Sequence, residues 1–403
     1  MWYNVDSGIG VFTIYKNLFI RLKIIKMGDS MFLNKVELQN FRNYEKQTIS
    51  FKSGINILVG KNGSGKTNIL ESIYYLAITH SHRTHDDSLL INNKNEFFKL
   101  KGIVSINSIK TNLEIDYINK KKLLKIDNND INALNKYSSY LKIIIFFPDD
   151  LDLIKGLPDV RRKYISTEIG QVYPSYNKVL DDYNRILKNR NEYIKKIRNN
   201  EYYNKQYLEI LNDYYIKKSI LLYKMRKKYV EKINDYIENI FKDITGLDKL
   251  TLEYVPIIDF NSYKDTEMYD KIKNSINFNE EISYGKSIYG PHRDEFKFML
   301  NDINLKQYGS QGQQRAAVLA LKLSEINIFT KVIGSTPILL LDDVFSELDE
   351  DRKNNLLKYI NGKIQTIITT TDIDNIDNKT LKKARVFEIS SGKVLRRKDD
   401  RNG

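Results

Sequence analysis

Hydrophobic and polar residues alternate at several places between residues 31 and 147, which predicts a series of β-strands. Val36 and Leu38 alternate with Lys35, Glu37 and Gln39, as in a strand with one buried face. Residues 40–43 are expected to end this strand as a loop. Further strands are predicted at 51–59 with a turn at Gly54, at 99–104, at 113–117 and at 143–147, and residues 127–130 are predicted to form a turn.

The hydrophobic period changes from two to three or four residues after about residue 148. No proline occurs between Pro174 and Pro256, and apolar residues recur at helical spacing from 179 to 240. This pattern predicts a helical arm with a hairpin near residues 199–203. The heptads are irregular, which favours a helical subdomain with charged outer faces over an extended coiled coil.

An α/β pattern returns after about residue 283. A helix is predicted at 316–329 and strands at 337–341, 365–369 and 386–389, the last at a sheet edge, with a solvated tail at 396–400. The predicted fold is therefore α/β, with a head formed by residues 31–147 and 284–403 and a helical arm, lobe II, at 148–283. Residues 1–30 do not resemble the rest, and we expect either an extension or a true start at Met27 or Met31.

The strongest chemical signal follows the short apolar run that ends at Val59. The next eight residues match G-x-x-x-x-G-K-[ST], and apolar residues at helical spacing follow them. Glycines allow backbone N–H groups to turn onto phosphate oxygens, and the helix N-terminus adds positive potential. The predicted nucleotide-binding residues are Gly60, Lys61, Asn62, Gly63, Ser64, Gly65, Lys66, Thr67 and Asn68. Lys66 would reach the β- and γ-phosphates of ATP, and the Thr67 hydroxyl would bind Mg²⁺.

A second motif ends the apolar strand at 338–341 with two carboxylates, as in a Walker B motif. Asp342 is predicted to bind Mg²⁺, usually through water, and Asp343 to orient the attacking water. A core strand with a polar exit is the alternative for this segment alone, but the phosphate loop favours the nucleotide site. Lys66, Asp342 and Asp343 are thus the predicted catalytic residues.

A third motif lies between these two and opens a helix. Ser310, Gly312 and Gln313 combine a hydroxyl, a close backbone approach and a helix N-terminus, which predicts a second anion site. The order of the three motifs is similar to that of ATP-binding-cassette ATPases. In that family the third motif faces the ATP of a partner subunit, so a complete site needs two chains. Residues 346–349 stand at the D-loop position of the same family.

The ordered set of motifs resembles the RecF family of bacterial recombination and gap-repair proteins, from residue 31 to the C-terminus. The matching segments are LQNFRNY at 38–44, SHRT at 81–84, PDDL at 148–151, residues 156–162 and 190–191, GPHRDE at 290–295, DDVFSELD at 342–349 and TTTD at 369–372. The resemblance implies an SMC-like ATPase head that dimerises on ATP and binds DNA at single-strand/double-strand junctions. It also implies work with RecO and RecR in loading RecA during gap repair, a role in the SOS response, and weak DNA-stimulated ATP hydrolysis.

Two positions depart from the general cassette pattern. Asp343 replaces the usual Glu, and Thr369 to Thr371 stand where a switch histidine is expected. Both differences favour a slow, timed clamp over a fast motor. Arg42 lies where SMC-like heads place a basic residue near the nucleotide, and an ordinary surface arginine is an equal alternative.

Composition adds less to this interpretation. The 403 residues carry a net charge of +14, which favours a polyanionic partner such as DNA, although Lys-rich coding bias accounts for part of it. There is no cysteine and no apolar run of membrane-spanning length, so we expect a cytoplasmic protein without a membrane partner. No DNA-reading motif is recognisable, so little sequence specificity is expected.

Several side chains remain ambiguous. The histidines at 80, 82 and 85 suggest a metal site, but a polar loop explains them better. His292, Arg293 and Asp294 are expected to hold the fold through an ion pair. Arg161–Lys163, Lys195 and Lys196 could contact DNA phosphates or form a solvated helix face. The alternative functions are a transporter ATPase subunit, a nuclease-associated head and a non-hydrolysing structural DNA protein.

Overall fold

The computed structural model describes residues 29–398, apart from residues 93–94, 133, 202, 248, 349, 361–363, 374–375 and 377. Most of the predicted N-terminal extension, Asp349 of the D-loop segment and the end of the predicted tail lie outside these described residues. In the part of the chain that is described, no helix is long and apolar enough to cross a lipid bilayer.

A six-stranded sheet carries the predicted nucleotide motifs. Its order is β16-β15-β3-β14-β13-β8, and all neighbours are parallel except β15 and β16. The strands are β3 (Ile55–Val59), β8 (Ile143–Phe146), β13 (Ile338–Asp342), β14 (Thr366–Thr370), β15 (Arg385–Ser390) and β16 (Lys393–Lys398). These bounds confirm the strands predicted at 143–147, 337–341 and 365–369. Of the strand predicted at 51–59, only the part after the Gly54 turn is a strand.

The continuous apolar character of these strands follows from burial on both faces. Leu339 and Leu341 of β13 belong to one hydrophobic cluster, whereas Ile338 and Leu340 belong to the cluster on the opposite face. Parallel strands buried on both faces need apolar residues at successive positions, so they lack the alternation of a half-exposed strand.

The prediction that residues 386–389 form an edge strand was wrong. β15 pairs with β3 on one side and with β16 on the other, so β16 is the edge. Ser391 and Gly392 both have positive φ, at 46° and 72°, which is the backbone conformation of a tight hairpin turn. Residues 396–398, which were predicted to begin a tail, therefore belong to strand β16.

A second, mostly antiparallel sheet covers the other side of the phosphate-loop helix. Its order is β12-β1-β4-β5-β6-β7, and β2 also pairs with β1. Its strands are β1 (Asp29–Phe41), β2 (Tyr44–Ser50), β4 (Phe97–Ile106), β5 (Ile109–Ile118), β6 (Lys121–Ile126), β7 (Asn129–Asp130) and β12 (Ser335–Thr336). The strands predicted at 99–104 and 113–117 are confirmed. The loop expected at 40–43 is shorter: Asn40 and Phe41 still belong to β1, and only residues 42–43 form the turn to β2.

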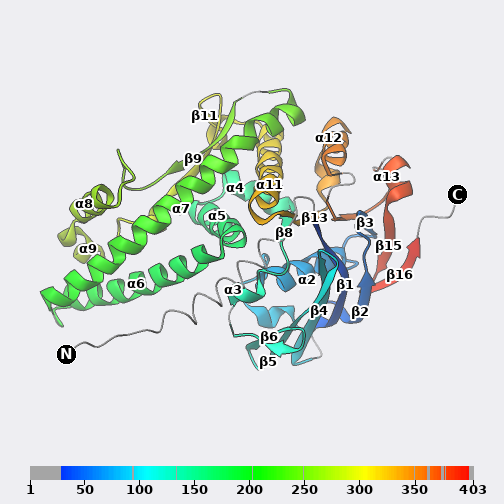
Figure 1. Ribbon diagram of the computed structural model, residues 1–403, viewed down its shortest axis with the longest axis horizontal. Helices are drawn as coiled ribbons and strands as arrows, with labels where there is room; N and C mark the ends of the chain where they lie inside the picture. The colour runs from blue at the N-terminus through cyan, green and yellow to red at the C-terminus, as the bar shows by residue number, and fades with distance from the viewer. Residues whose placement is uncertain are drawn as a thin grey trace, which may run out of the picture.

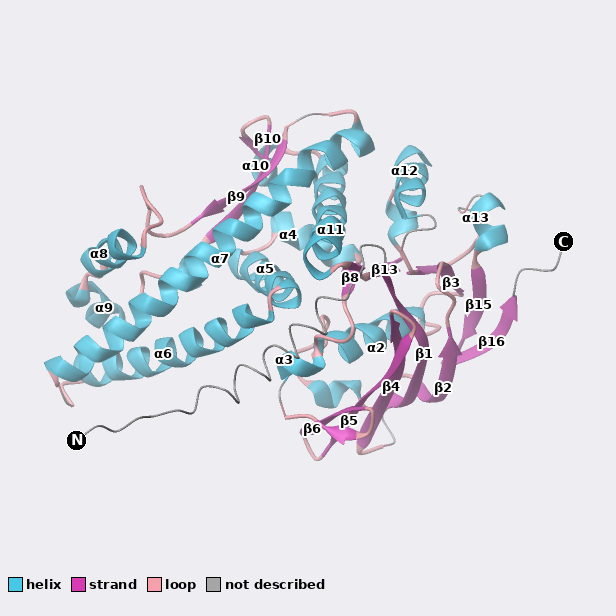
Figure 2. Ribbon diagram, viewed as in Figure 1, coloured by secondary structure: helices cyan, strands magenta, loops and turns pink. Residues whose placement is uncertain are grey.

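Helix α2 (Lys66–Ile78) lies between the two sheets, as Figures 1 and 2 show. Its side chains join residues of both sheets in one hydrophobic cluster, and nearly every residue of the helix after Asn68 is buried. This position fixes the phosphate loop, because the helix that begins there cannot shift without disturbing both sheets.

The far face of the six-stranded sheet packs against helices, and an arm extends from them (Figure 1). The main helices are α5 (Pro158–Val172), α6 (Pro174–Arg198), α7 (Lys205–Thr245) and α11 (Gln311–Ile333). α6 and α7 form the predicted helical hairpin, connected by residues 199–204. The smaller helices are η1 (Asp87–Leu90), α3 (Leu134–Tyr137), η2 (Pro148–Leu151), α4 (Asp152–Lys155), α8 (Asp265–Ser275), α9 (Phe278–Tyr284), η3 (Pro291–Arg293), α10 (Leu305–Tyr308), η4 (Val344–Glu347), α12 (Glu350–Ile360) and α13 (Asn378–Lys383).

A three-stranded sheet beside α7 was not predicted. It consists of β9 (Leu250–Val255), β10 (Glu295–Leu300) and β11 (Ile303–Asn304), in the order β11-β10-β9. β9 pairs with β10 across about 40 intervening residues, so this sheet joins chain segments on both sides of residue 284.

Candidate functional site

The phosphate loop is held in its turned conformation by glycines and by the β1–β2 hairpin. Gly63 and Gly65 have φ of 77° and 114°, values that residues with a side chain rarely adopt. The Tyr44 hydroxyl donates to the Gly65 carbonyl at 3.1 Å, and Asn43 Nδ2 donates to the Ser64 carbonyl at 3.3 Å. These bonds explain why the residues after β1 matter to the site: the hairpin turn fixes the loop from the side.

Lys66 folds back onto the loop that precedes it. Its Nζ donates to the carbonyls of Gly60 and Lys61 at 2.6 and 3.0 Å. Burial lowers the pKa of Lys66, while the charges of Asp343 and Asp342 oppose that effect. Ser64 Oγ is also buried and has no hydrogen-bond partner among the described residues. A cationic amine and an unpartnered hydroxyl at a glycine turn suit a phosphate group.

The two Walker motifs meet although 275 residues separate them in sequence. Thr67 Oγ1 donates to Asp342 Oδ1 at 2.9 Å, and Thr369 Oγ1 donates to the same oxygen at 2.7 Å. The Thr369 hydroxyl also accepts a bond from the backbone N–H of Asp343 at 2.9 Å. Burial raises the pKa of Asp342, and the two threonine hydroxyls oppose this rise. From the neighbouring strand β14, Thr369 therefore holds the carboxylate of Asp342 and the backbone of Asp343.

Asn68 is the last of the residues predicted to bind nucleotide at the phosphate loop, and its side chain forms hydrogen bonds with Asn43 and Arg83. Its Nδ2 donates to Asn43 Oδ1 at 2.8 Å, and its Oδ1 accepts a bond from Arg83 at 3.0 Å. Lys61, Asn62 and Gly63 form the exposed rim of the loop. The residues predicted from Gly60 to Asn68, with Asp342 and Asp343, thus occupy one continuous site.

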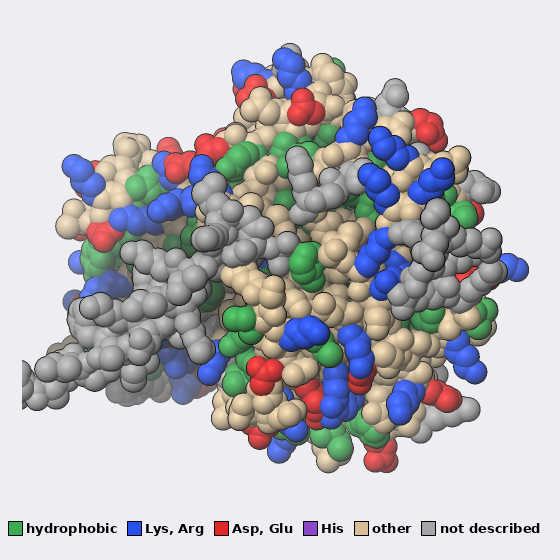
Figure 3. All heavy atoms as spheres, turned by 45° about the vertical axis from the view of Figure 1, so that its right-hand side comes forward, with side chains coloured by type: hydrophobic (Ala, Val, Ile, Leu, Met, Phe, Trp, Pro, Cys, Tyr) green, Lys and Arg blue, Asp and Glu red, His purple; other side chains and the backbone are tan. Residues whose placement is uncertain are grey.

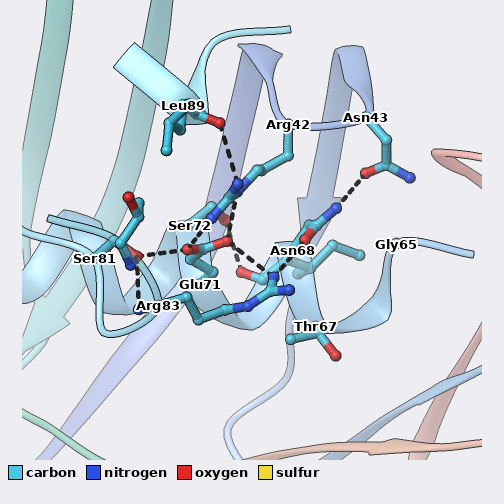
Figure 4. Close-up of polar contacts among 12 residues, drawn as sticks. Arg42, Asn43, Gly65, Thr67, Asn68, Glu71, Ser72, Ser81, Arg83 and Leu89 are labelled. Carbon is cyan, nitrogen blue, oxygen red and sulfur yellow. Dashed lines mark hydrogen bonds and ion pairs between the residues drawn. The ribbon is translucent and has the colours of Figure 1, made fainter. Parts of the chain in front are cut away.

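Arg42 lies beside this loop in a charged network that Figure 4 shows. Its Nε and Nη2 donate to the two carboxylate oxygens of Glu71 at 2.9 and 2.8 Å. Glu71 is fully buried in α2 and also accepts bonds from Ser81 and Arg83. Arg42 is therefore a bidentate partner of a buried carboxylate and not an ordinary surface arginine. Its predicted contact with nucleotide stays a prediction.

The sequence did not single out Glu71 or Arg83 as site residues. Burial alone would raise the pKa of Glu71, but hydrogen bonds from Arg42 and Ser81 and the charges of both arginines hold it below its usual value. The available signal was a Glu among the buried apolar residues of the α2 pattern, because a fully buried carboxylate needs a cationic partner.

The third motif lies at the N-terminus of α11, where Ser310 is exposed and Gly312 and Gln313 are half-buried. Ser310 Oγ accepts a bond from the Gln313 N–H at 3.2 Å, and Gln313 Oε1 accepts one from the Ser310 N–H at 2.9 Å, which is a capping box. A Cβ on Gly312 would lie 3.3 Å from Arg352 Nη1. Within the described residues, no hydrogen bond or ion pair joins 310–313 to Gly60–Asn68, so the chain does not bring these two motifs together.

Of the remaining candidates, Arg161 and Asp294 are structural, whereas Lys163, Lys195 and Lys196 are exposed and their contact with DNA phosphates stays a prediction. Arg161 is buried and paired with Glu295 at 2.7 Å, so it is unavailable for the predicted DNA contact. Asp294 pairs with the buried Arg226 at 2.9 Å, which confirms the structural interpretation of that motif. The described part of the chain contains no group of three or more metal-binding side chains, and His82 stacks on Phe147.

Comparison with known proteins agrees with this geometry. The model of the RecF/RecN/SMC N-terminal domain family matches residues 32–393. The chain is 37% identical over 371 residues to the DNA replication and repair protein RecF of Staphylococcus epidermidis, covering 91% of this chain and 100% of that protein. It is 38% identical over 374 residues to RecF of Pediococcus pentosaceus, with 92% and 100% covered.

Solved structures agree as well. The recombination mediator protein RecF with ATP, of the RecFOR pathway, has a TM-score of 0.83 and 31% identity, with 92% of this chain and 98% of that chain covered. The Smc head domain from Pyrococcus furiosus has a TM-score of 0.51 at 15% identity, which shows only a shared fold. The chain therefore belongs to the RecF family of DNA replication and repair proteins, within the class of SMC-like ATPase heads.

Proposed function

We propose that this protein is an ATP-dependent clamp on DNA in recombinational gap repair. ATP binding would join two copies, and slow hydrolysis would release them. The proposed head consists of residues 31–147 and 284–403, and residues 148–283 form lobe II. The observation that carries the proposal is the 2.9 Å bond between Thr67 and Asp342, because it joins the phosphate loop to the acidic strand end.

The residues present fit a nucleotide triphosphate. Lys66 and the backbone from Gly60 to Thr67 would hold the phosphates, and Asp343 would orient the attacking water. Bound Mg²⁺, held by Thr67 and Asp342, would neutralise charge on the transferred phosphate. The shorter side chain of Asp343 and the threonine at 369 support slow turnover, as expected for a switch.

The exposed position of Ser310 supports a composite site made by two chains. Ser310, Gly312 and Gln313 lie at the start of α11, and they share no bond with the phosphate loop of their own chain. A second copy would bring its phosphate loop to this helix N-terminus, which favours anionic groups. ATP would then shift the equilibrium toward the closed dimer, because it would bind the dimer more tightly than the separate chains.

The positive net charge of the chain and its membership of the RecF family support DNA as the ligand. The chain carries a net charge of +14, and Figure 3 shows Lys and Arg side chains gathered on the head in the upper right of that view. Lys and Arg side chains that contact phosphates bind single- and double-stranded DNA with little sequence specificity. The relative named for the RecFOR pathway supports RecO and RecR as partners, and junction binding, RecA loading and a cytoplasmic location belong to the same proposal.

Light scattering of the purified chain, with and without ATP and Mg²⁺, tests the composite site. We expect a dimer only with ATP, lost in Lys66→Ala and in Ser310→Arg. Ser139→Arg is the matched control, since Ser139 is an exposed serine in another loop. A monomer under every condition would remove the clamp mechanism.

The alternatives differ in measurable ways. A transporter subunit or nuclease-associated head would need a membrane or nuclease partner to co-purify with the chain. A non-hydrolysing structural DNA protein would bind gapped DNA equally well as Lys66→Ala. We expect instead that Lys66→Ala loses the ATP-dependent part of binding to gapped DNA, measured by fluorescence anisotropy.

A further inference from the structure

Asn62 and Gly63 form the exposed tip of the phosphate loop. The turn that they occupy is closed by a bond from the Ser64 N–H to the Lys61 carbonyl at 3.2 Å. The other bonds that fix the loop reach residues on either side of this pair. Within the described part of the chain, neither the side-chain amide of Asn62 nor the backbone N–H of Gly63 has a hydrogen-bond partner.

An asparagine followed by a glycine carries a built-in reaction. The backbone nitrogen of the glycine attacks Cγ of the asparagine, and the absence of a side chain on the glycine leaves that approach open. The new N–Cγ bond forms as the Cγ–Nδ2 bond breaks, and ammonia leaves with the proton of the glycine N–H. Water then opens the cyclic imide at either carbonyl, which gives aspartate or isoaspartate.

Local structure decides where this reaction can proceed. The sequence has two further Asn-Gly pairs, at 361–362 and 402–403, and both lie outside the described residues. Asn274 is also exposed and is followed by the small Ser275, but both residues belong to helix α8. Backbone N–H groups within a helix donate to the carbonyl four residues earlier, which holds the nitrogen away from the preceding side chain. Asn62 has no such restraint on its neighbour.

From these observations we propose that Asn62 is a site of spontaneous deamidation in the nucleotide-free protein and that bound nucleotide protects it. Gly63 has a φ of 77°, as in loops whose backbone N–H groups turn inward onto phosphate oxygens. A bound phosphate would hold the Gly63 nitrogen and keep it from Asn62. The protection rests on the proposed function, whereas the reaction in the nucleotide-free chain does not.

Deamidation would reduce the affinity of the loop for ATP. It places a carboxylate at the rim of a loop whose glycines, lysine and helix N-terminus favour anionic groups, and that negative charge repels phosphate. In the isoaspartate product the side-chain carbon also enters the backbone, so the loop becomes longer and its N–H groups move. A chain that stays without nucleotide would therefore lose its ATP site with time, and a chain that cycles through ATP would keep it.

The test follows residue 62 in the purified full chain during storage at pH 8 and 37 °C, with and without saturating ATPγS and Mg²⁺. Samples are digested at acidic pH, which prevents further reaction, and peptide mapping by mass spectrometry separates residue 62 from the other asparagines. We expect aspartate and isoaspartate to accumulate at residue 62 without nucleotide and several-fold more slowly with ATPγS. Asn274 is the matched control, and we expect it to stay unchanged in both samples.

Two variants separate the chemistry from its consequence. Gly63→Ala adds a methyl group that meets no atom within 4 Å, but this group crowds the attack on Asn62, so we expect several-fold slower conversion. Its melting temperature is measured as well, because alanine disfavours the φ of this position. Asn62→Asp reproduces one product, and we expect about tenfold or more weaker binding of fluorescent ATPγS, with an unchanged melting temperature.

Each part of the proposal has its own refutation. A nucleotide-free chain that converts residue 62 no faster than Asn274 would overturn the modification site, as would equally fast conversion in a folded Gly63→Ala. Equal rates with and without ATPγS would overturn the protection, and wild-type affinity in Asn62→Asp would overturn the loss of ATP binding. If the fresh wild-type chain binds no ATPγS, the proposed function itself fails, while the nucleotide-free sample still decides whether Asn62 is modified.

Discussion

Glu325 places a carboxylate at the centre of the contact between α11 and the helices of the arm. It is fully buried, and it accepts hydrogen bonds from Tyr164 on α5 at 2.5 Å and from Tyr229 on α7 at 3.4 Å. Burial raises its pKa from 4.5 to about 7, although the Tyr164 bond and the charge of Lys322 oppose the rise. We predict that Glu325→Gln stabilises the fold above pH 7.

The sign follows from proton linkage. The folded chain holds the Glu325 proton more tightly than the unfolded chain, so its contribution to stability is full below pH 4.5 and is lost as pH rises through about 7. One pKa unit corresponds to about 1.4 kcal/mol, so ionising Glu325 in the fold costs on the order of 3 kcal/mol at pH 8. Gln keeps an acceptor for the tyrosines and removes this cost.

Thermal unfolding followed by circular dichroism from pH 5 to 8.5 checks the prediction. Burial lowers the pKa of His80, His82 and His292 to about 4. Between pH 4 and 6.5 these histidines therefore bind protons mainly in the unfolded chain, so the stability of the fold rises with pH in that range. The quantity to compare is therefore the melting temperature of Glu325→Gln minus that of the wild type. We expect a small difference at pH 5 and a rise of a few degrees by pH 8. A difference that stays constant with pH, as expected for the exposed control Glu209→Gln, would refute the reasoning.

Three further predictions concern the Arg226–Asp294 pair, the phosphate loop and Thr369. Arg226→Met leaves Asp294 buried without its cation, so we expect a loss of about 3–5 kcal/mol in urea unfolding, against about 0.5 kcal/mol or less for the exposed Lys217→Met. Gly65→Ala should abolish nucleotide binding in calorimetry, because φ is 114° there; retained binding would show that the loop can rearrange. Thr369→Val should slow ATP hydrolysis at least tenfold with little change in ATP affinity, and an equal loss of both would contradict an orienting role.

The elements that the sequence predicted correctly are those with local patterns. Gly60 to Thr67 has fixed spacing between a strand and a helix, and the strand ending at Asp342 is continuously apolar. The helical hairpin followed from a period of three to four residues without proline. Even the long-range contact between Thr67 and Asp342 was predictable, because each motif implies the other.

The features that the sequence missed depend on pairing between distant segments. β9 and β10 are short strands that pair with each other across distant parts of the chain, so no local pattern marks them. β16 depends on the hairpin turn at Ser391 and Gly392, where both residues have positive φ. Glu71 and Arg83 lie on a helix and a loop whose approach is fixed by Ser81. Hydrophobic periodicity along the sequence carries no information about such contacts between side chains.

The contacts of α11 support the proposal that a second chain completes the site. Ser310 begins this helix, and Lys322 in its middle donates to the Ile145 carbonyl of β8 at 2.5 Å and to Asp150 at 2.7 Å. β8 pairs with β13, the strand that ends in Asp342, so α11 is fixed to the sheet that carries the phosphate loop. Because one buried ion pair and the Glu325 contacts hold the helix on both sides, Ser310 cannot swing to the nucleotide of its own chain without breaking them. This supports the proposal that Ser310 would meet the nucleotide of another copy.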